Sequence, residues 1–309
     1  MNAVQLNQTS NSRGFDSVFS EVTNNRQINL ANQNCLRLFH LEIRNNQFSF
    51  DGLIRFLRKN IGRYVFSRAS IENFRLEGEE EAIGLEAIEL LRKASNPKDS
   101  GAGGELGEIL LYLFLEQKLN APKLLSKVEL KTTKGQYVFG SDGVHLLQLN
   151  GQPAPSFQLV LGESKIQGDL KTAVDSAFVS IAGVSQDTSN EIRLIEANLL
   201  AESFDPVTTE FIKSLIVPSK RNLSINVDNA FGLFLGYSLD LDGTKMSNSE
   251  YRTAASQKMA TDIQNIASYI EKKIADTGLS GYSFYVYVIP FNNAAEERAA
   301  IITKLKGGG

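Results

Sequence analysis

The chain has 309 residues, of which 42% are hydrophobic and 22% charged, and its 32 Lys and Arg against 35 Asp and Glu give a formal charge of −3. This composition is that of an ordinary globular protein, long enough for one large or two modest domains without disulfides or metal ions as staples. The near-neutral charge excludes a protein that binds nucleic acid through bulk positive charge. It does not exclude an enzyme whose local carboxylates and bound cation act on nucleic acid.

Cysteine usage and the lack of long apolar runs predict a cytoplasmic location. The single Cys35 cannot form an internal bridge, and the first residues, MNAVQLNQTSNSRGF, contain no basic-then-apolar leader. The longest apolar run, ILLYLFL at 109–115, is far shorter than the roughly 20 residues that a membrane span needs. We therefore expect a cytoplasmic protein that does not span a membrane.

The first hundred residues predict a small α+β unit after a start that is loose or depends on a partner for its order. Residues 1–30 are rich in Asn, Gln and Ser, with too few apolar side chains to order by themselves. The alternation LRLFHLEI from Leu36 predicts a strand. Apolar residues at helical spacing predict helices over 50–66 and 79–94.

A segment rich in Gly, Pro, Asp and Ser, SNPKDSGAGG at 95–104, is the clearest boundary in the chain. We place a domain junction there. The sequence thus predicts an N-terminal α+β domain over residues 1–98 and a second domain over residues 99–309.

The second domain begins with a helix, GELGEILLYLFLEQKL, that is apolar nearly all round and is therefore predicted to be buried. Alternation and turn residues then predict three strands, and helical spacing predicts a helix after them. Two short helices, a strand, a long helix, the strand YSFYVYVIPF and a last short helix should complete the chain. The predicted ranges are strands 127–132, 137–149, 157–166 and 229–239, and helices 169–184, 190–204, 206–216 and 247–276.

Acids in otherwise apolar segments are the best candidates for chemistry. Glu163 and Lys165 alternate in LVLGESKI, so both side chains project from one face of a strand. Burying both charges there is costly unless they are paired or bind an ion. Asp142, in VFGSDGVHLL, precedes Glu163 by an interval that suits a hairpin of two adjacent strands. The two carboxylates should therefore meet at one end of the sheet.

The buried helix supplies two further acids, Glu105 and Glu108, which lie three apart and are neighbours on one side of it. If this helix packs on the sheet, Glu108 can reach Asp142 and Glu163. Three converging carboxylates would repel one another without a divalent cation, and hard oxygen ligands select Mg²⁺ or Mn²⁺. Glu105 equally suits a helix start, where acids interact favourably with the helix dipole.

The order helix-Glu, strand-Asp, strand-Glu-x-Lys, helix over residues 104–184 resembles the PD-(D/E)XK nuclease superfamily. The resemblance implies an α/β, restriction-endonuclease-like core with helical elaborations. It further implies that Asp142 and Glu163 bind the metal, that Lys165 is the catalytic lysine, and that Glu108 is the helix acid, with Glu105 as its alternative. The first motif departs from the superfamily pattern because Ser141 stands where Pro is usual.

More specifically, GELGEILLYLFLEQ, GSDGVHLL and LVLGESKI resemble the HamA family of Hachiman anti-phage defence systems. The resemblance extends to the terminal YVIPFNNAAEERAAII and covers about two thirds of the chain. It implies a metal-dependent DNA endonuclease controlled by a helicase partner, HamB. This chain has no GxxxxGK[ST] loop, so any use of ATP must come from another chain.

Simpler interpretations stay open at this point. Glu163 and Lys165 could form an ordinary ion pair on a strand surface, and Asp142 could be a turn acid beside glycines. The two histidines, His40 and His145, lie in different predicted domains and offer no zinc site or catalytic triad. The whole chain could be a catalytically silent interaction subunit, or an RNase that uses the same residues.

Overall fold

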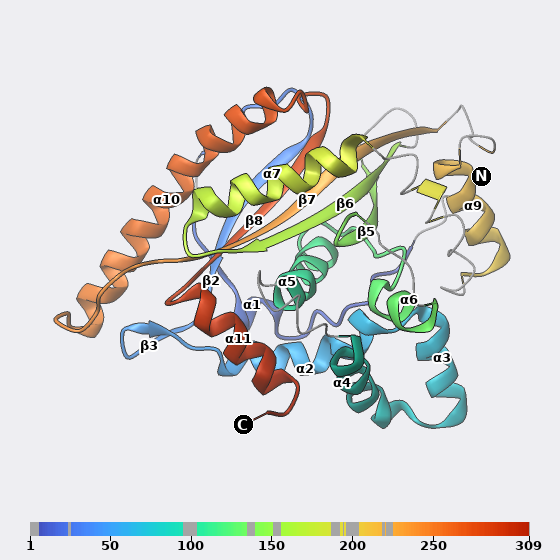
Figure 1. Cartoon of the computed structure of the whole chain (residues 1–309), viewed down its shortest axis with the longest axis horizontal. Coiled ribbons are helices and arrows are strands. Elements are labelled where there is room, and N and C mark those ends of the chain that lie inside the picture. The colour runs from blue at the N-terminus through green and yellow to red at the C-terminus, as the bar shows by residue number, and fades with distance from the viewer. Residues whose placement is uncertain are drawn as a thin grey trace.

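The chain folds around one six-stranded mixed sheet (Figure 1). The computed structural model of the protein describes residues 6–23, 26–94, 104–134, 140–150, 156–186, 192–193, 195, 204–217, 220 and 225–308. The sheet contains β1 (Ser20–Glu21), β2 (Asn34–His40), β5 (Gly143–Leu149), β6 (Ser156–Ile166), β7 (Asn226–Ser238) and β8 (Ser283–Phe291), and β3 (Ile43–Arg44) pairs separately with β4 (Gln47–Phe48).

The strand order across the sheet is β1-β2-β8-β7-β6-β5. Neighbours among the four inner strands are parallel, whereas β1 and β5 are antiparallel to the strands beside them. Parallel pairs need crossover connections, which helices supply here between β6 and β7 and between β7 and β8. The protein is therefore of the α/β class, as the sequence predicts.

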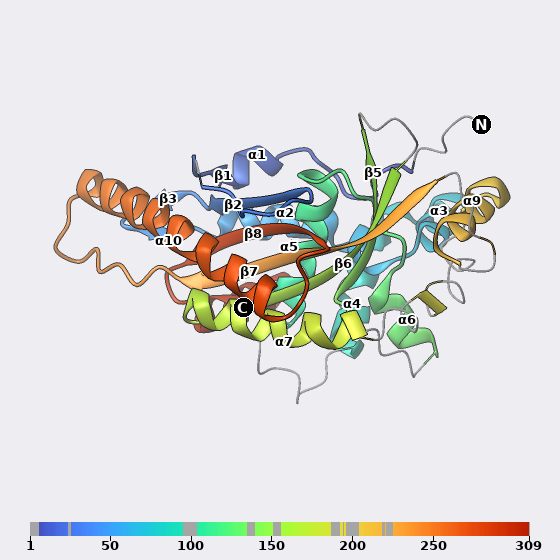
Figure 2. The same ribbon diagram turned by 90° about the horizontal axis from the view of Figure 1, so that it is seen from above.

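Helices cover both faces of the sheet, and α10, with 29 residues, runs along its flank in both views (Figures 1 and 2). No helix in the described ranges is both long enough and apolar enough to cross a membrane. The helices are α1 (Phe15–Val18), α2 (Asp51–Val65), α3 (Arg68–Glu77), the 3₁₀ turn η1 (Glu80–Ala82), α4 (Ile83–Ala94), α5 (Gly104–Gln117), α6 (Lys127–Lys134), α7 (Leu170–Gln186), α9 (Pro206–Ile216), α10 (Asn248–Asp276) and α11 (Ala294–Leu305).

The two faces of the sheet carry different helices. On one face, α5 contacts β6 and β7, and a Cβ added at Gly162 or Gly232 would meet Leu111 or Leu115 of this helix. On the other face α7 contacts the same strands, with α10 packed against α7 and β2. The α5 helix is thus enclosed between the sheet and the helices α2 and α11. This explains why its sequence is apolar nearly all round.

Most predicted elements are confirmed, including β6, α7, α9, α10 and β8. The predicted strand over 127–132 is wrong, because this segment is the helix α6. A run of six residues is too short for its periodicity to separate strand from helix. Tertiary contacts decide the outcome: Glu129 accepts hydrogen bonds from the Ser67 backbone N–H and the Ser70 hydroxyl. The predicted helix over 190–204 falls almost wholly outside the described residues.

The start of the chain, predicted to be loose, is packed over residues 6–23. The carboxylate of Glu116, fully buried at the end of α5, accepts hydrogen bonds from the backbone N–H groups of Thr9 (2.8 Å) and Ser10 (2.5 Å). Phe15 packs its ring 5.1 Å from that of Phe114. The order of this segment therefore comes from contacts with α5, which local composition does not reveal.

The predicted junction between residues 98 and 99 lies outside the described residues, and the division into two domains stays a prediction. The segments on either side of it share one sheet, since β2 pairs in parallel with β8. They also share one hydrophobic core, which joins Leu38 and Leu57 to Phe114 and Phe234. Residues 1–98 therefore contribute directly to the sheet.

The close approach of α5 to β6 predicts opposite effects of one substitution at two helical glycines. A Cβ at Gly107 would lie 2.8 Å from the Ser164 Oγ, whereas one at the exposed Gly183 of α7 would have nothing within 4 Å. We expect Gly107→Ala to lower the free energy of unfolding by about 1–3 kcal/mol. Gly183→Ala should raise it by about 0.5–1 kcal/mol. Urea unfolding measures both, and a stabilised Gly107→Ala variant would contradict the close packing.

Candidate active site

Asp142 lies immediately before β5, where the β5–β6 hairpin fixes its position. Its backbone N–H donates to the carbonyl of Gly162 (2.7 Å), which continues the antiparallel register that pairs Gly143 with Gly162. Its Oδ2 accepts hydrogen bonds from the backbone N–H (2.9 Å) and the hydroxyl (2.8 Å) of Ser164. The Asp142 carboxylate therefore sits beside the Glu-x-Lys segment of β6, at the end of the sheet where the sequence predicts it.

Glu163 and Lys165 project from the same face of β6, as their alternation predicts. The Lys165 Nζ lies 2.5 Å from the Glu163 Oε1. Ser180 of α7 also hydrogen-bonds the Glu163 carboxylate. Only 5% of the Glu163 side chain is exposed, against 21% of the Lys165 side chain. Glu163 is therefore the buried member of the pair, and Lys165 is the member that reaches solvent.

The environment of Glu163 disfavours its charged form. Burial raises the pKa of Glu163 to about 7, and the negative charge of Asp142 adds to this effect, which Lys165 only partly opposes. A buried carboxylate of raised pKa beside a second carboxylate is common at functional sites. It also marks a place where additional positive charge would be stabilising.

Lys127, which the sequence analysis did not single out, lies between Glu108 and Asp142. The Lys127 Nζ, at the start of α6, lies 3.2 Å from the Asp142 Oδ1 and 3.7 Å from the Glu108 Oε1. Burial by itself lowers the pKa of Lys127, but the charges of Glu108 and Asp142 outweigh it, so this pKa is raised. The Tyr64 hydroxyl of α2 donates to the Glu108 Oε2 at 3.0 Å. Lys127 fell in the segment predicted as a strand, and no local signal pointed to Tyr64.

Glu105 turns toward another part of the fold. Its carboxylate forms an ion pair with the Lys306 Nζ at 2.6 Å, beyond the end of α11. Of the two predicted helix acids, Glu108 is therefore the one beside Lys127 and Asp142. This distinction needs the orientation of α5, which the sequence spacing alone does not give.

The predicted convergence of three carboxylates is not found. Ser164 faces α5, whereas Glu163 and Lys165 face α7, so Glu108 and Glu163 lie toward opposite faces of β6. Among the described residues, no three His, Cys, Asp or Glu side chains are grouped so that they could hold a metal ion. Asp142 lies beside β6, close both to the residues on the α5 side and to Glu163 on the α7 side.

Two other polar residues, His145 and Lys171, lie on β5 and α7, and His145 lines a small hollow together with Asp142. His145 is buried on β5, where its Nδ1 pairs with the Ala121 carbonyl at 2.8 Å, and burial lowers its pKa to about 4. His145 is therefore a buried residue of the core with a depressed pKa. Lys171, at the start of α7, places its Nζ 5.5 Å from the ring centroid of Tyr269, so its ammonium packs against that ring.

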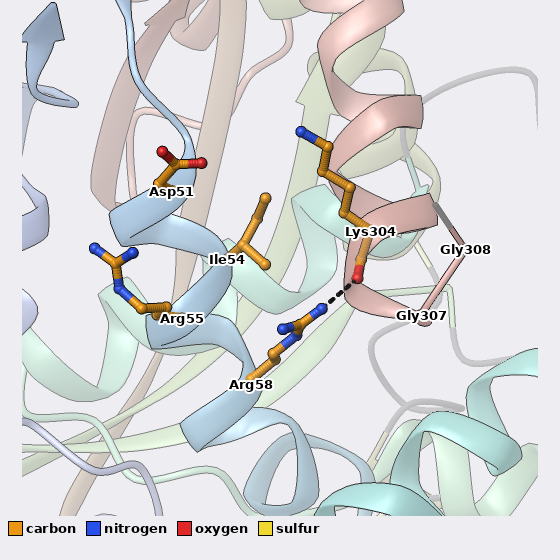
Figure 3. Close-up of a pocket in the computed structure, with 7 residues that line it drawn as sticks. All are labelled: Asp51, Ile54, Arg55, Arg58, Lys304, Gly307 and Gly308. Carbon is orange, nitrogen blue, oxygen red and sulfur yellow. Dashed lines mark hydrogen bonds between the residues drawn. The ribbon is translucent and has the colours of Figure 1, made fainter.

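Two hollows are relevant to ligand binding. A small one of about 30 Å³ adjoins the site and includes Tyr64, Lys127 and Asp142 in its lining. A larger one of about 420 Å³ lies between α2 and α11 (Figure 3), and we call it the basic hollow. It is lined by Asp51, Ile54, Arg55, Arg58, Lys304, Gly307 and Gly308. With a single carboxylate, the basic hollow is not the site that the acids form.

Comparison with known proteins gives one match that covers most of the chain. The model of the HamA family matches residues 16–305. No curated protein matches the sequence. The matched range includes all five predicted site residues, namely Glu105, Glu108, Asp142, Glu163 and Lys165.

The raised pKa of Glu163 predicts a pH-dependent effect of Glu163→Gln on stability. The ordinary pKa of a Glu side chain is 4.5. Between pH 4.5 and about 7, Glu163 therefore keeps its proton in the folded chain but has lost it in the unfolded chain. Stability linked to Glu163 is therefore present below pH 4.5 and is lost as the pH rises through 7. The neutral Gln avoids this loss, so the variant should exceed wild type by about 1–3 kcal/mol at pH 8 and by much less at pH 5.

Thermal or urea unfolding across this pH range measures the difference. Glu210→Gln, at a carboxylate of which 63% is exposed, is the matched control, and its small effect on stability should be nearly the same at both pH values. A difference between Glu163→Gln and wild type that does not vary with pH would contradict the raised pKa.

Proposed function

The chain belongs to the HamA family and is thus a Hachiman-associated protein, and we propose that it is the metal-dependent DNA endonuclease of a Hachiman anti-phage defence system. In this proposal it hydrolyses phosphodiester bonds in the cytoplasm. A helicase partner resembling HamB controls it. The proposed catalytic residues are Glu108, Asp142, Glu163 and Lys165.

One observation carries the proposal: Asp142 lies beside the buried Glu163–Lys165 pair at one end of the β5–β6 hairpin. Asp142 directly precedes β5 and Glu163 lies in β6, and their side chains are held by specific hydrogen bonds rather than solvated at random. A carboxylate with a pKa of about 7 is costly to keep ionised. Such a cost is typical of residues that are retained for chemistry rather than for stability.

A divalent cation fits this pair in ligand type and in charge. Carboxylate oxygens are the ligands that Mg²⁺ and Mn²⁺ prefer, and Mg²⁺ commonly uses only one or two of them while keeping several waters. Burial, and then repulsion from Asp142, raise the pKa of Glu163, and a bound cation would stabilise its charged form against both. Asp142 and Glu163 would hold the ion. Glu108 lies toward the other face of β6 and Glu105 pairs with Lys306, so in this proposal neither is a direct ligand of the ion.

The residues around the pair have distinct proposed roles. When bound, the cation would polarise a phosphodiester oxygen and lower the pKa of the attacking water. The partly exposed Lys165 ammonium would orient that water or stabilise charge on the phosphate. Lys127 holds Asp142 from the other side of the strand edge, and Tyr64 orients Glu108. These contacts fix the acids before substrate binds.

The order of elements supports a PD-(D/E)XK core. A helix (α5) precedes an antiparallel hairpin (β5 and β6), and a helix (α7) then leads to a strand (β7) that is parallel to β6. In this proposal the remaining elements are elaborations on that core. The alternative of a catalytically silent interaction subunit is favoured by Lys127, whose single ammonium already pairs with two of the acids.

Cleavage of supercoiled plasmid by the purified chain tests the proposed activity. We expect cutting in Mg²⁺ or Mn²⁺, none in EDTA, and a loss of at least about a hundredfold in the Glu163→Gln, Lys165→Ala double variant, because each group acts on the reacting phosphate. The assay is run with and without the helicase partner and ATP. Matched RNA substrates separate a DNase from an RNase.

A surface ion pair of the same kind provides the control. Glu210 and Lys213, 3.2 Å apart on α9, allow the matched Glu210→Gln, Lys213→Ala variant, which should cut like wild type. Circular dichroism verifies that both double variants are folded. If the wild-type chain cuts neither DNA nor RNA with partner, ATP and DNA ends all present, the interaction-subunit alternative is correct.

The position of Lys127 predicts a link between this residue and metal binding. Lys127→Met leaves Glu108 and Asp142 without the ammonium between them, so we expect a loss of about 2–4 kcal/mol in EDTA. Mn²⁺ should stabilise this variant more than it stabilises wild type, because the cation can then neutralise the same acids. Thermal unfolding in EDTA and in Mn²⁺ measures both effects. Equal stabilisation of the two proteins by Mn²⁺ would show that Lys127 does not compete with the metal.

A further inference from the structure

The basic hollow concentrates positive charge on a chain whose formal charge is −3. Arg55 and Arg58 lie one turn apart on α2, and Arg58 reaches the last turn of α11, which carries Lys304 (Figure 3). Asp51 is the single acid in the lining. Within the described part of the chain, the side chains of Arg55 and Lys304 take part in no ion pair. The hollow therefore has a local excess of cations that the fold leaves exposed.

Two arginines are anchored in a way that orients them. The Arg58 Nη2 donates to the Lys304 carbonyl at 2.8 Å, and the Arg92 Nη2, from the end of α4, donates to the Lys306 carbonyl. Each bond uses one of the five N–H groups of a guanidinium and leaves others for a ligand. The bonds also offset the negative end of the α11 dipole. These bonds therefore reduce the repulsion that an anion would meet at the C-terminal end of α11.

Contacts of α11 join the basic hollow to the candidate active site. Lys306 forms an ion pair with Glu105, one turn before Glu108 on α5. Arg298, near the start of α11, donates to the carbonyl of Ile166 at 3.1 Å, the residue directly after Lys165. The helix that lines the hollow is therefore fixed both to the helix that carries Glu108 and to the strand that carries Lys165.

We propose that the basic hollow binds the phosphodiester backbone of nucleic acid and guides it toward the carboxylates around Asp142. Guanidinium groups match phosphate oxygens in pairs, and a volume of about 420 Å³ admits a phosphate with its sugar. The choice of nucleic acid over an acidic protein rests on the proposed nuclease function and on the connection through α11. Binding itself requires no cleavage.

The test measures DNA binding by the full chain in EDTA, on a Glu163→Gln background, by fluorescence anisotropy between about 50 and 200 mM salt. The Arg55→Gln, Lys304→Gln double variant should bind at least tenfold more weakly at low salt. Its slope of log K against log salt should be smaller by about two, one for each lost phosphate contact. Both side chains are exposed, so folding should be unaffected.

Lys245→Gln, Lys272→Gln is the matched control, because both lysines are exposed and the net charge changes equally. It should bind DNA like the background protein. Equal affinity and slope in the two double variants would overturn the proposal. So would retained DNA binding with loss of binding to the helicase partner, which would make the hollow a protein-docking surface. Weakened DNA binding in a chain that never cleaves would support the hollow while refuting the nuclease.

Discussion

The close packing of α5 against β6 determines where the side chains of the candidate site lie. Gly107 and Gly162 allow the helix and strand to approach so closely that a Cβ at either position would meet the other element. This close packing places Glu108 beside β6. It also places Ser164 against Gly107, where the Ser164 hydroxyl donates a hydrogen bond to Asp142. The apolar face that drives this packing is continuous along α5, from Leu106 to Leu115. The same contact that builds the core therefore also positions the acids.

The charges of the site are balanced from two sides of one strand. Lys165 neutralises Glu163 on the face covered by α7, and Lys127 lies between Asp142 and Glu108 on the face covered by α5. Three acids against two lysines leave one negative charge, in a setting where burial makes it costly. In the proposed function, a divalent cation would offset this remaining charge. The α2 helix contributes Tyr64 to the site, and the Tyr64 hydroxyl donates a hydrogen bond to Glu108.

Sequence alone predicted the features that depend on local periodicity. The alternation in β6 gave the shared face of Glu163 and Lys165, and the interval to Asp142 gave the hairpin that brings the acids together. It could not decide between Glu105 and Glu108, because the rotation of α5 depends on its contacts with α2, α11 and the sheet. It missed Lys127 because α6 is held as a helix by contacts of Glu129 with residues about sixty positions away. In each case the missing information was a long-range contact.

The pairing of β2 has a consequence for the order in which the protein is assembled. This strand has the two-residue β1 on one side and β8 on the other, and β8 begins about 240 residues after β2 ends. On the ribosome, β2 must therefore wait for about 240 further residues to be synthesised before its main neighbour exists. The residues around Asp142 and Glu163 emerge well before that moment. Closure of the sheet around them therefore has to follow the synthesis of β8, so a chain that stops before β8 lacks the assembled sheet.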